Sequence, residues 1–261
     1  MLARFREALD AGLRTGAGLL VLPPALLFHC ALALLLASLG AGPALLQRCY
    51  VSFARLSLFV GGIQVEARGA ESVPPDRAFV VVLNHESGLD PLCLLASLPR
   101  LPLRFVVKEQ VMRIPLLGHA LRQTGNVTVV RTDTRGDIER IRRGMGERAL
   151  EVSMVFFAEG TRSRDGALHA FKLGAFATAL AYGLPILPVA IAGTFRICPK
   201  GMLRLRRGHV AIEVGTPIPV ERLGFEQREP LRERTRAVVS ALRVEARRRI
   251  RERGLDPGGI D

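Results

Sequence analysis

Short apolar segments alternate with helical segments over most of this sequence, and that alternation constrains the fold more than any other feature. The segments that we predict as strands, rich in β-branched and apolar residues, are 63–67, 78–83, 104–107, 126–130, 153–157, 186–192 and 209–214. Segments with helical periodicity lie between them, at 91–98, 114–123, 135–150 and 171–182. This order predicts an α/β fold with a mixed, mostly parallel sheet flanked by helices.

The strongest chemical signal is the turn after the second predicted strand, which reads Asn84-His85-Glu86-Ser87-Gly88-Leu89-Asp90-Pro91. Asp before Pro predicts a helix start, because the carboxylate can accept a bond from a first-turn amide and Pro loses no bond at the first helical position. His85 and Asp90 can meet only if the chain folds back between them, which Gly88 permits. In that case Asp90 holds one imidazole nitrogen protonated and leaves the other free as a base. The alternative is a strand-end histidine beside a simple helix cap.

A second polar turn follows the strand predicted at 153–157 and reads Phe157-Ala158-Glu159-Gly160-Thr161-Arg162-Ser163. Gly160 lets the backbone turn, and successive amides with the hydroxyls and the Arg162 guanidinium would suit a phosphate group. Glu159 would then orient Arg162 or complete the environment of the histidine. The alternative is a surface turn with an internal Glu/Arg pair.

Two further cations end strand candidates in the same way. Lys108 and Arg131 each follow the last residue of a predicted strand. The C-terminal ends of parallel strands share one edge of an α/β sheet, where ligands bind, so we expect these cations beside His85 and the Glu159 turn. The convergence of one base with several cations predicts a phosphorylated substrate beside a histidine.

Other catalytic machinery and metal sites have no matching pattern in the sequence. It contains no G-x-S-x-G nucleophile elbow, no G-x-x-x-x-G-K-[ST] phosphate loop and no G-x-G-x-x-G at a strand-to-helix turn. His85-Glu86 lacks the second histidine of a zinc protease, and the other histidines are scattered. The cysteines are widely spaced in apolar surroundings, which predicts buried free thiols in a reducing compartment. We therefore expect neither a metal nor a resident cofactor.

A second constraint lies near the N-terminus, where no Asp, Glu, Lys or Arg occurs from residue 15 to residue 46. One straight helix of that length would be about 48 Å long, well beyond a bilayer core of about 30 Å. Pro23-Pro24 and the run at 40–43 are predicted to break it. Arginines flank both ends, which favours both ends on the cytoplasmic side and hence a helical hairpin in the membrane. The alternatives are a single span and a cleaved signal peptide.

The net charge of +13 and the hydrophobic content of 49% favour opposite environments. Segregation reconciles them, with apolar residues near the N-terminus and cations elsewhere, as expected at an anionic membrane face. Nucleic acid is not an expected partner, because aromatics are only 5% and Trp is absent. The tail at 229–253 has a helical pattern, either of a surface helix packed on the core or of one that contacts phospholipid. We expect a membrane-associated helical region at 1–60, an α/β domain at 61–225, and a basic C-terminal helix and tail at 226–261.

Three blocks make the sequence recognisable: NHESGLD at 84–90, GNVTVVR at 125–131 and FAEGTRS at 157–163. They resemble blocks of the glycerolipid acyltransferase family, specifically the bacterial 1-acyl-glycerol-3-phosphate acyltransferases, and the similarity runs from Phe53 to Thr216. The segment LPVAI at 187–191 looks like a fourth block of that family. One departure is Ala158, where the family usually has Pro, a change that affects turn rigidity more than chemistry. The resemblance implies the glycerolipid acyltransferase fold with an N-terminal hydrophobic helical hairpin.

The resemblance also implies a role for each matching residue. His85 is the expected general base and Asp90 its orienting partner. Lys108 is expected near the reacting centre, and Pro188 is expected to shape the substrate channel. The residues expected to line the glycerophosphate site are Gly125, Arg131, Glu159, Gly160, Thr161 and Arg162.

The implied activity is transfer of an acyl chain from acyl-CoA or acyl carrier protein to the free sn-2 hydroxyl of 1-acyl-glycerol-3-phosphate (lysophosphatidic acid), which gives phosphatidic acid at the cytoplasmic face of the inner membrane. The residues agree with it, because a thioester is already activated and an imidazole suits deprotonation of the attacking hydroxyl. Three alternatives stay open. They are another acceptor, such as glycerol-3-phosphate or a lyso-ornithine lipid; a thioester or lipid hydrolase with the same dyad; and a non-catalytic basic protein that binds membranes.

Overall fold

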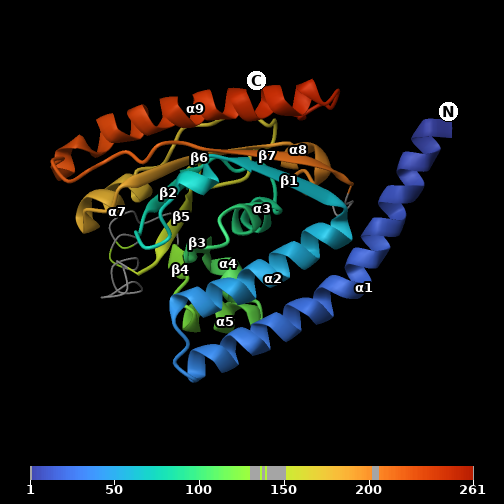
Figure 1. Ribbon diagram of the computed structural model, residues 1–261, viewed down its shortest axis with the longest axis horizontal. Coiled ribbons are helices and arrows are strands. Elements are labelled where there is room, and N and C mark those ends of the chain that lie inside the picture. The colour runs from blue at the N-terminus through green and yellow to red at the C-terminus, as the bar shows by residue number, and fades with distance from the viewer. Residues whose placement is uncertain (1, 130–135, 137–138, 140–150, 202–205, 261) are drawn as a thin grey trace.

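The strands in the described part of the chain form a seven-stranded sheet in the order β1-β7-β6-β2-β5-β3-β4 (Figure 1). This computed structural model describes residues 2–129, 136, 139, 151–201 and 206–260. The strands are β1 (Ile63–Arg68), β2 (Val80–Leu83), β3 (Leu103–Lys108), β4 (Val127–Val129), β5 (Ser153–Phe157), β6 (Ile186–Ala192) and β7 (Gly208–Val214). Each of these strands overlaps one of the segments predicted from the sequence.

The sheet is mixed, and most of its pairings are parallel. Strands β6, β2, β5, β3 and β4 pair in parallel with their neighbours. Strand β7 pairs antiparallel with β6, and β1 pairs in parallel with β7. The predicted α/β fold class is therefore confirmed. Because the five strands from β6 to β4 run in one direction, their C-terminal ends lie along one edge of the sheet.

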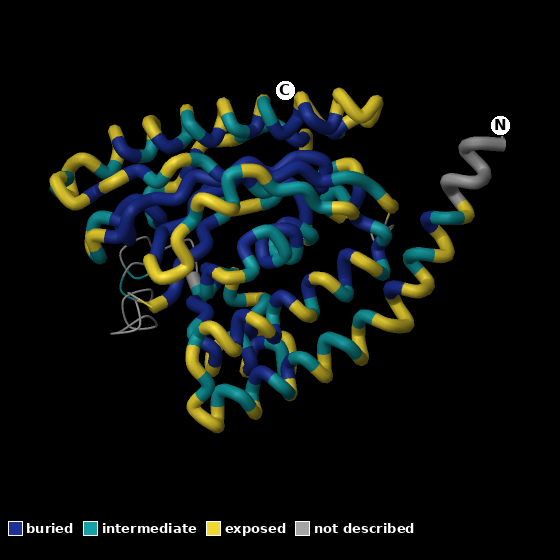
Figure 2. Tube along the Cα trace, viewed as in Figure 1, coloured by how far each residue is buried: buried dark blue, intermediate teal, exposed yellow. Residues whose placement is uncertain are grey.

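Helices cover both faces of the sheet, which explains why its central strands are continuous apolar runs rather than alternating ones. Val80 and Val82 of β2 pack on the face covered by α7 (Gly174–Tyr182) and α9 (Arg228–Glu252), whose core residues include Phe176 and Val239. Val81 and Leu83 pack on the other face, which α3 (Asp90–Ser97) and α2 (Pro43–Gly61) cover. Figure 2 shows the strands as the most continuously buried part of the chain.

Short helices and helical turns lie between these elements. They are α4 (Glu109–Met112), α5 (Leu117–Gln123), α8 (Thr194–Ile197) and the 3₁₀ turns η1 (Ala70–Ser72) and η3 (Phe225–Gln227). The helices predicted at 114–123 and 171–182 each begin three residues later than expected, and the tail predicted at 229–253 is α9. The helix predicted at 135–150 lies outside the described residues except for 136 and 139.

The N-terminal residues form a helical hairpin, but its arms differ from the prediction. Helix α1 (Leu2–Ser38) runs through Pro23 and Pro24, so the break expected there is wrong. Both prolines are exposed on this continuous helix. The expected break at 40–43 is confirmed, because α1 ends at Ser38 and α2 begins at Pro43. The second arm, α2, extends past the charge-free stretch to the left-handed Gly62 that leads into β1.

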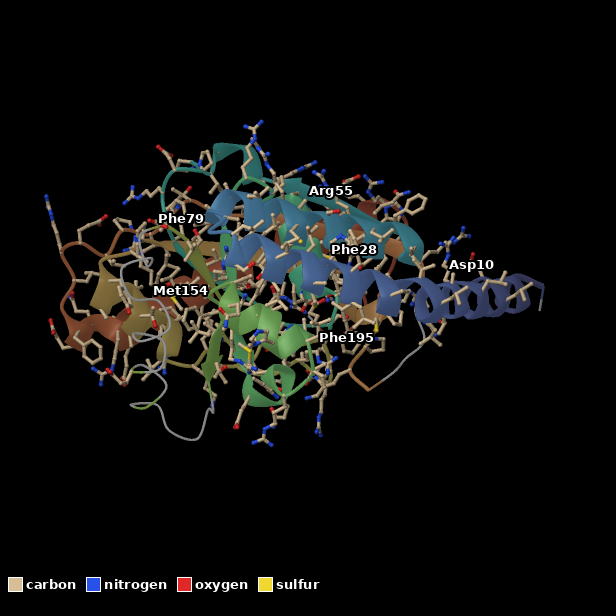
Figure 3. All side chains as sticks on the ribbon, turned by 90° about the horizontal axis from the view of Figure 1, so that it is seen from below. Asp10, Phe28, Arg55, Phe79, Met154 and Phe195 are labelled. Carbon is tan, nitrogen blue, oxygen red and sulfur yellow. The ribbon has the colours of Figure 1, made fainter. Side chains whose placement is uncertain are left out.

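Helix α1 presents a long apolar surface to its surroundings. The stretch Leu9–Ser38 is long and apolar enough to cross a membrane by length and composition, and little of it is buried. Leu13, Leu20 and Phe28 are among its most exposed large side chains, at 67%, 78% and 62%. Figures 1 and 3 show α1 projecting past the sheet at its N-terminal end, with Phe28 and Arg55 marking the two arms in Figure 3. The division of the chain at residues 60 and 225 stays a prediction.

Gln47 connects the hairpin to the sheet. Its side chain is 1% exposed; Oε1 accepts a hydrogen bond from the Leu103 amide at 3.0 Å, and Nε2 reaches the Leu98 carbonyl at 3.5 Å. This amide group therefore satisfies the backbone where β3 begins, beneath α2.

Replacing Gln47 by Leu removes the acceptor of the Leu103 amide and leaves that donor buried. We expect the free energy of unfolding in detergent to fall by about 1–3 kcal/mol. The matched control is Arg48→Gln on the exposed side of the same helix, which should change stability little. A Gln47→Leu protein as stable as the wild type would contradict this account.

Candidate active site

His85 and Asp90 meet across the turn between β2 and α3. His85 Nδ1 lies 2.7 Å from Asp90 Oδ2, and the same oxygen accepts hydrogen bonds from the amides of Glu86 at 2.7 Å and Ser87 at 2.8 Å. The Asp90 carboxylate is fully buried. The sequence correctly places a helix start here, but the expected cap is wrong, because this carboxylate binds the amides of the preceding turn rather than those of the first helical turn.

This arrangement fixes the tautomer of His85. Oδ2 already accepts two backbone N–H groups, so the hydrogen shared with the ring must come from Nδ1, which leaves Nε2 with its lone pair. The ring also stacks on Phe157, with centroids 4.0 Å apart and planes at 24°. Its side chain is 15% exposed. His85 is thus held in one orientation and remains accessible, which suits a general base.

Strand register places Glu159 beside His85. Leu83 of β2 pairs with Phe157 of β5, so the residues two positions later leave the sheet at the same level. Glu159 Oε1 accepts the His85 amide at 2.9 Å, and Oε2 accepts the His169 amide at 3.0 Å. Burial raises the pKa of Glu159, while these two hydrogen bonds oppose the rise. The sequence predicts that Glu159 either orients Arg162 or completes the environment of the histidine, and the structure shows the second role.

Asn84 ties the same turn to the neighbouring strand. Its Oδ1 accepts the Ile191 amide and its Nδ2 donates to the Ile191 carbonyl, both at 2.9 Å. This bidentate pair continues the β2–β6 pairing by one step after the strand ends. Nothing in the local sequence identifies the partner, because 107 residues separate the two positions.

The Arg162 guanidinium lies over the His85 turn. A Cβ atom added to Gly88 would stand 3.5 Å from Arg162 Nη1, so the absence of a side chain at Gly88 leaves room for it. Gly160, with φ at 76°, makes the turn that carries Thr161 and Arg162 to this place. The two turns predicted separately from the sequence therefore meet.

A third segment, the loop after α8, joins both turns. Ser87 Oγ donates to the Cys198 carbonyl at 2.6 Å, and Lys200 Nζ donates to Thr161 Oγ1 at 3.1 Å and to the Arg162 carbonyl at 3.4 Å. Sequence reasoning missed Lys200. The signal available was that it follows β6, whose C-terminal end shares the edge with β2 and β5.

The other predicted residues fall in different places. Lys108 is the exposed last residue of β3, on the same edge as His85 with β5 between their strands. Gly125 precedes β4 and lies near Arg104, at the opposite edge. Pro188 lies inside β6 opposite Val82, on the face covered by α9. The structure therefore does not bring Gly125 or Pro188 to the cluster, and Arg131 lies outside the described residues.

A nearby group of Ser163, Asp165 and His169 resembles a catalytic triad in composition but not in geometry. Ser163 Oγ donates to Asp165 Oδ1 at 2.8 Å, and His169 Nε2 contacts that same oxygen at 3.1 Å. A hydroxyl activated by histidine would need the ring between it and the carboxylate. Hydrogen bonds from the Ala167 amide and from Ser163 lower the pKa of Asp165 to about 2. The group is a loop turn, and among the described residues no His, Cys, Asp and Glu side chains gather to hold a metal ion.

Comparisons with known proteins identify the family. A family model described as Acyltransferase matches residues 64–192. A 1-acyl-sn-glycerol-3-phosphate acyltransferase of Escherichia coli (strain K12) is 31% identical over 195 residues, which cover 74% of this chain and 78% of that relative. This chain belongs to the acyltransferase family.

Two further relatives extend the comparison. The crystal structure of a 1-acyl-sn-glycerophosphate acyltransferase from Thermotoga maritima matches 90% of this acyltransferase-family chain and 96% of its own, with a TM-score of 0.72 and 27% identity. A chloroplastic 1-acyl-sn-glycerol-3-phosphate acyltransferase of Arabidopsis thaliana is 36% identical over 157 residues, 59% of this chain and 44% of that protein. The chain thus spans less than half the length of the chloroplastic relative.

Glu86 is a second buried acid of the histidine turn, and its pKa is strongly raised. Burial raises its pKa to about 8, the charge of Asp90 adds to the rise, and Arg243 and Arg247 oppose it. Arg243 Nε lies 3.4 Å from Glu86 Oε1. The neutral acid is therefore favoured in the folded protein over a pH range where the unfolded chain is ionised.

Glu86 should make stability depend on pH. Because its folded pKa of about 8 exceeds the ordinary value of 4.5, its contribution is complete below pH 4.5 and is lost as the pH rises to about 8. Relative to Glu86→Gln, the wild type should lose free energy of unfolding over that range, as measured by denaturation at a series of pH values. Glu229→Gln, an exposed acid, should keep the slope of the wild type. Parallel curves for the wild type and Glu86→Gln would contradict this assignment.

Proposed function

We propose that this acyltransferase-family chain transfers an acyl group from a thioester to the free sn-2 hydroxyl of 1-acyl-glycerol-3-phosphate and so forms phosphatidic acid. The observation that carries the proposal is the contact of His85 Nδ1 with Asp90 beside the Glu159–Arg162 turn. The relative from Escherichia coli, which bears the name of this activity, supports the same acceptor. A base beside cations fits an alcohol that carries a phosphate group.

The chemistry requires one proton transfer and no covalent enzyme intermediate. Nε2 of His85 takes the proton of the sn-2 hydroxyl as the oxygen attacks the thioester carbonyl. The new C–O bond forms, the C–S bond breaks, and the imidazolium returns its proton to the departing thiolate. Asp90, bound to Nδ1, stabilises the imidazolium and keeps the ring in place. General-base assistance of this kind contributes roughly 10²- to 10⁴-fold in rate.

Arg162, Thr161 and Lys200 would hold the phosphate group of the acceptor. The guanidinium lies over Gly88, within the turn that carries His85, and Lys200 is bound to the Thr161 hydroxyl. A phosphate held there would bring the rest of the glycerol unit next to the imidazole, which turns the attack into a step between positioned groups. Lys108 and Arg131, which lies outside the described residues, would extend the positive edge toward β3 and β4.

The hairpin would hold this edge at a lipid surface. The exposed apolar side chains of α1 favour membrane insertion, and a lysophospholipid resides in the same layer. We place the chain at the cytoplasmic face of the inner membrane, where acyl-CoA or acyl carrier protein would deliver the thioester. Both donors are acidic, and a net charge of +13 would attract either one.

The direct test is a radiolabelled acyl-transfer assay with 1-acyl-glycerol-3-phosphate as acceptor. His85→Ala should lower kcat by about 10²- to 10⁴-fold, and Asp90→Asn should lower it as well, because both remove general-base assistance. His119→Ala, an exposed histidine on α5, is the matched control and should retain wild-type turnover. Release of free fatty acid without an acceptor, or full turnover by His85→Ala, would contradict the proposal.

Lys200 provides a separate test of phosphate binding. Lys200→Ala should raise the KM for 1-acyl-glycerol-3-phosphate about ten- to a hundredfold, because a hydrogen bond to a charged group contributes about 1.5–3 kcal/mol. The KM for the thioester should change much less, and Lys200→Arg, which keeps the charge, should recover most of the affinity. Equal effects on the two substrates would show that Lys200 does not contact the phosphate.

A further inference from the structure

The guanidinium of Arg243 joins three distant segments of the chain. Arg243 lies on α9, and its side chain is 5% exposed. Its Nε lies 3.4 Å from Glu86 Oε1 in the histidine turn, and one of its terminal nitrogens donates both to the Gly166 carbonyl and to the Ile260 carbonyl. Two of these segments carry the proposed catalytic and phosphate-binding groups, and the third is the C-terminal tail.

The contact with Glu86 reaches the centre of the histidine turn. Asn84 Nδ2 also donates to Glu86 Oε1, at 3.3 Å, and the Asn84 side chain is bound in turn to Ile191 of β6. Glu86 itself donates its amide to the Asp90 carboxylate that orients His85. Arg243 therefore contacts a residue that follows His85 in the sequence and is hydrogen-bonded to Asp90.

The contact with Gly166 belongs to the loop that continues from Arg162. This loop leaves the Glu159 turn and returns to α7, and Ser163 donates its amide to the His85 carbonyl at 2.8 Å. We call residues 256–260 the strap. Ile260 of the strap donates its amide to the Asp165 carbonyl at 2.9 Å, so the strap lies directly against this loop.

A second arginine on α9 fastens the strap. Arg247 donates to the Gly258 carbonyl at 2.7 Å and to the Gly259 carbonyl at 3.4 Å. Gly259 and Gly166 face each other so closely that a Cβ atom on Gly259 would stand 2.6 Å from Gly166 Cα. The strap therefore lies between α9 and the loop that continues from Arg162, and where Gly259 meets Gly166 there is no room for a side chain.

We propose that Arg243 is a positioning residue, which with the strap holds the Arg162 loop in a fixed relation to the His85 turn. The inference rests on the proposed acyl transfer, because it concerns the distance between the phosphate site and the base. Arginine suits this role, since its rigid planar fork can serve several acceptors at once and a lysine ammonium cannot reproduce that geometry. A misplacement of about 1 Å between two reacting groups can cost on the order of a hundredfold in rate.

The first experiment separates positioning from stability. Arg243→Met and Arg243→Lys should each lower kcat about ten- to a hundredfold in acyl transfer at a temperature well below their melting points. Val239→Ala, one helical turn earlier in the packed face of α9, serves as a control for destabilisation of the helix. Arg234→Met, an exposed arginine of α9, controls for loss of charge. Both controls should keep the kcat of the wild type.

The second experiment perturbs the strap without touching Arg243. Gly259→Val places a side chain against the Gly166 backbone, at a position with φ of 70°, and should displace the strap. We expect the same fall in kcat as for Arg243→Met. The double variant should be no slower than the slower single variant, because both changes break the same link.

The outcomes distinguish this inference from the proposed function. An active wild type with Arg243→Met, Arg243→Lys and Gly259→Val all at full kcat would overturn the positioning role and leave acyl transfer standing. An equal loss of kcat in Val239→Ala would also overturn it, since helix stability would then explain the effect. A wild-type protein without acyl transfer would instead overturn the proposed function itself.

Discussion

The Asp90 carboxylate is the group on which the rest of the site depends. One oxygen, Oδ2, receives the Glu86 and Ser87 amides and the ring nitrogen of His85. The same contacts fold the turn and select the histidine tautomer, so the local backbone and the chemistry share one acceptor. Because the carboxylate is fully buried, the hydrogen bonds to Oδ2 replace those that water would otherwise make.

The sheet brings the other groups to that carboxylate. Glu159 reaches the His85 amide because β2 and β5 end in register, and Asn84 binds Ile191 because β6 continues on the other side of β2. The long apolar strands therefore do more than fill the core. Their parallel direction gathers polar turns from separate parts of the sequence at one edge, as expected for α/β folds.

The sequence predicted those parts that have a local signal. The strands were predictable because both faces of the sheet are buried, so each one is a short, continuous apolar run such as Val80–Leu83. The meeting of His85 with Asp90 was predictable in kind, because a Gly-containing turn and an Asp-Pro helix start restrict the chain locally. The path of α1 was not predictable in this way, because the exposed prolines at 23 and 24 remain inside a continuous helix.

The pairing of particular side chains across long separations has no local signal, although the shared strand edge indicates which turns come together. Lys200 reaches Thr161 from 39 residues away, and Arg243 reaches Glu86 from 157 residues away. The basic pattern of α9 predicts a charged helix and not which arginine turns inward. Three arginines of α9 are buried, and each donates to acceptors in other segments: Arg243, Arg247 and Arg249. Part of the positive charge of α9 therefore lies inside the protein and does not face phospholipid.

The most direct test of the central claim is the protonation of His85 observed by NMR in protein labelled with ¹⁵N at its five histidines, with the signal assigned by its loss in His85→Gln. The account predicts a neutral ring with the proton on Nδ1 and a bare Nε2 above the pH at which the ring loses its second proton. A neutral ring protonated on Nε2 would contradict it, because that tautomer has no base to offer an attacking hydroxyl.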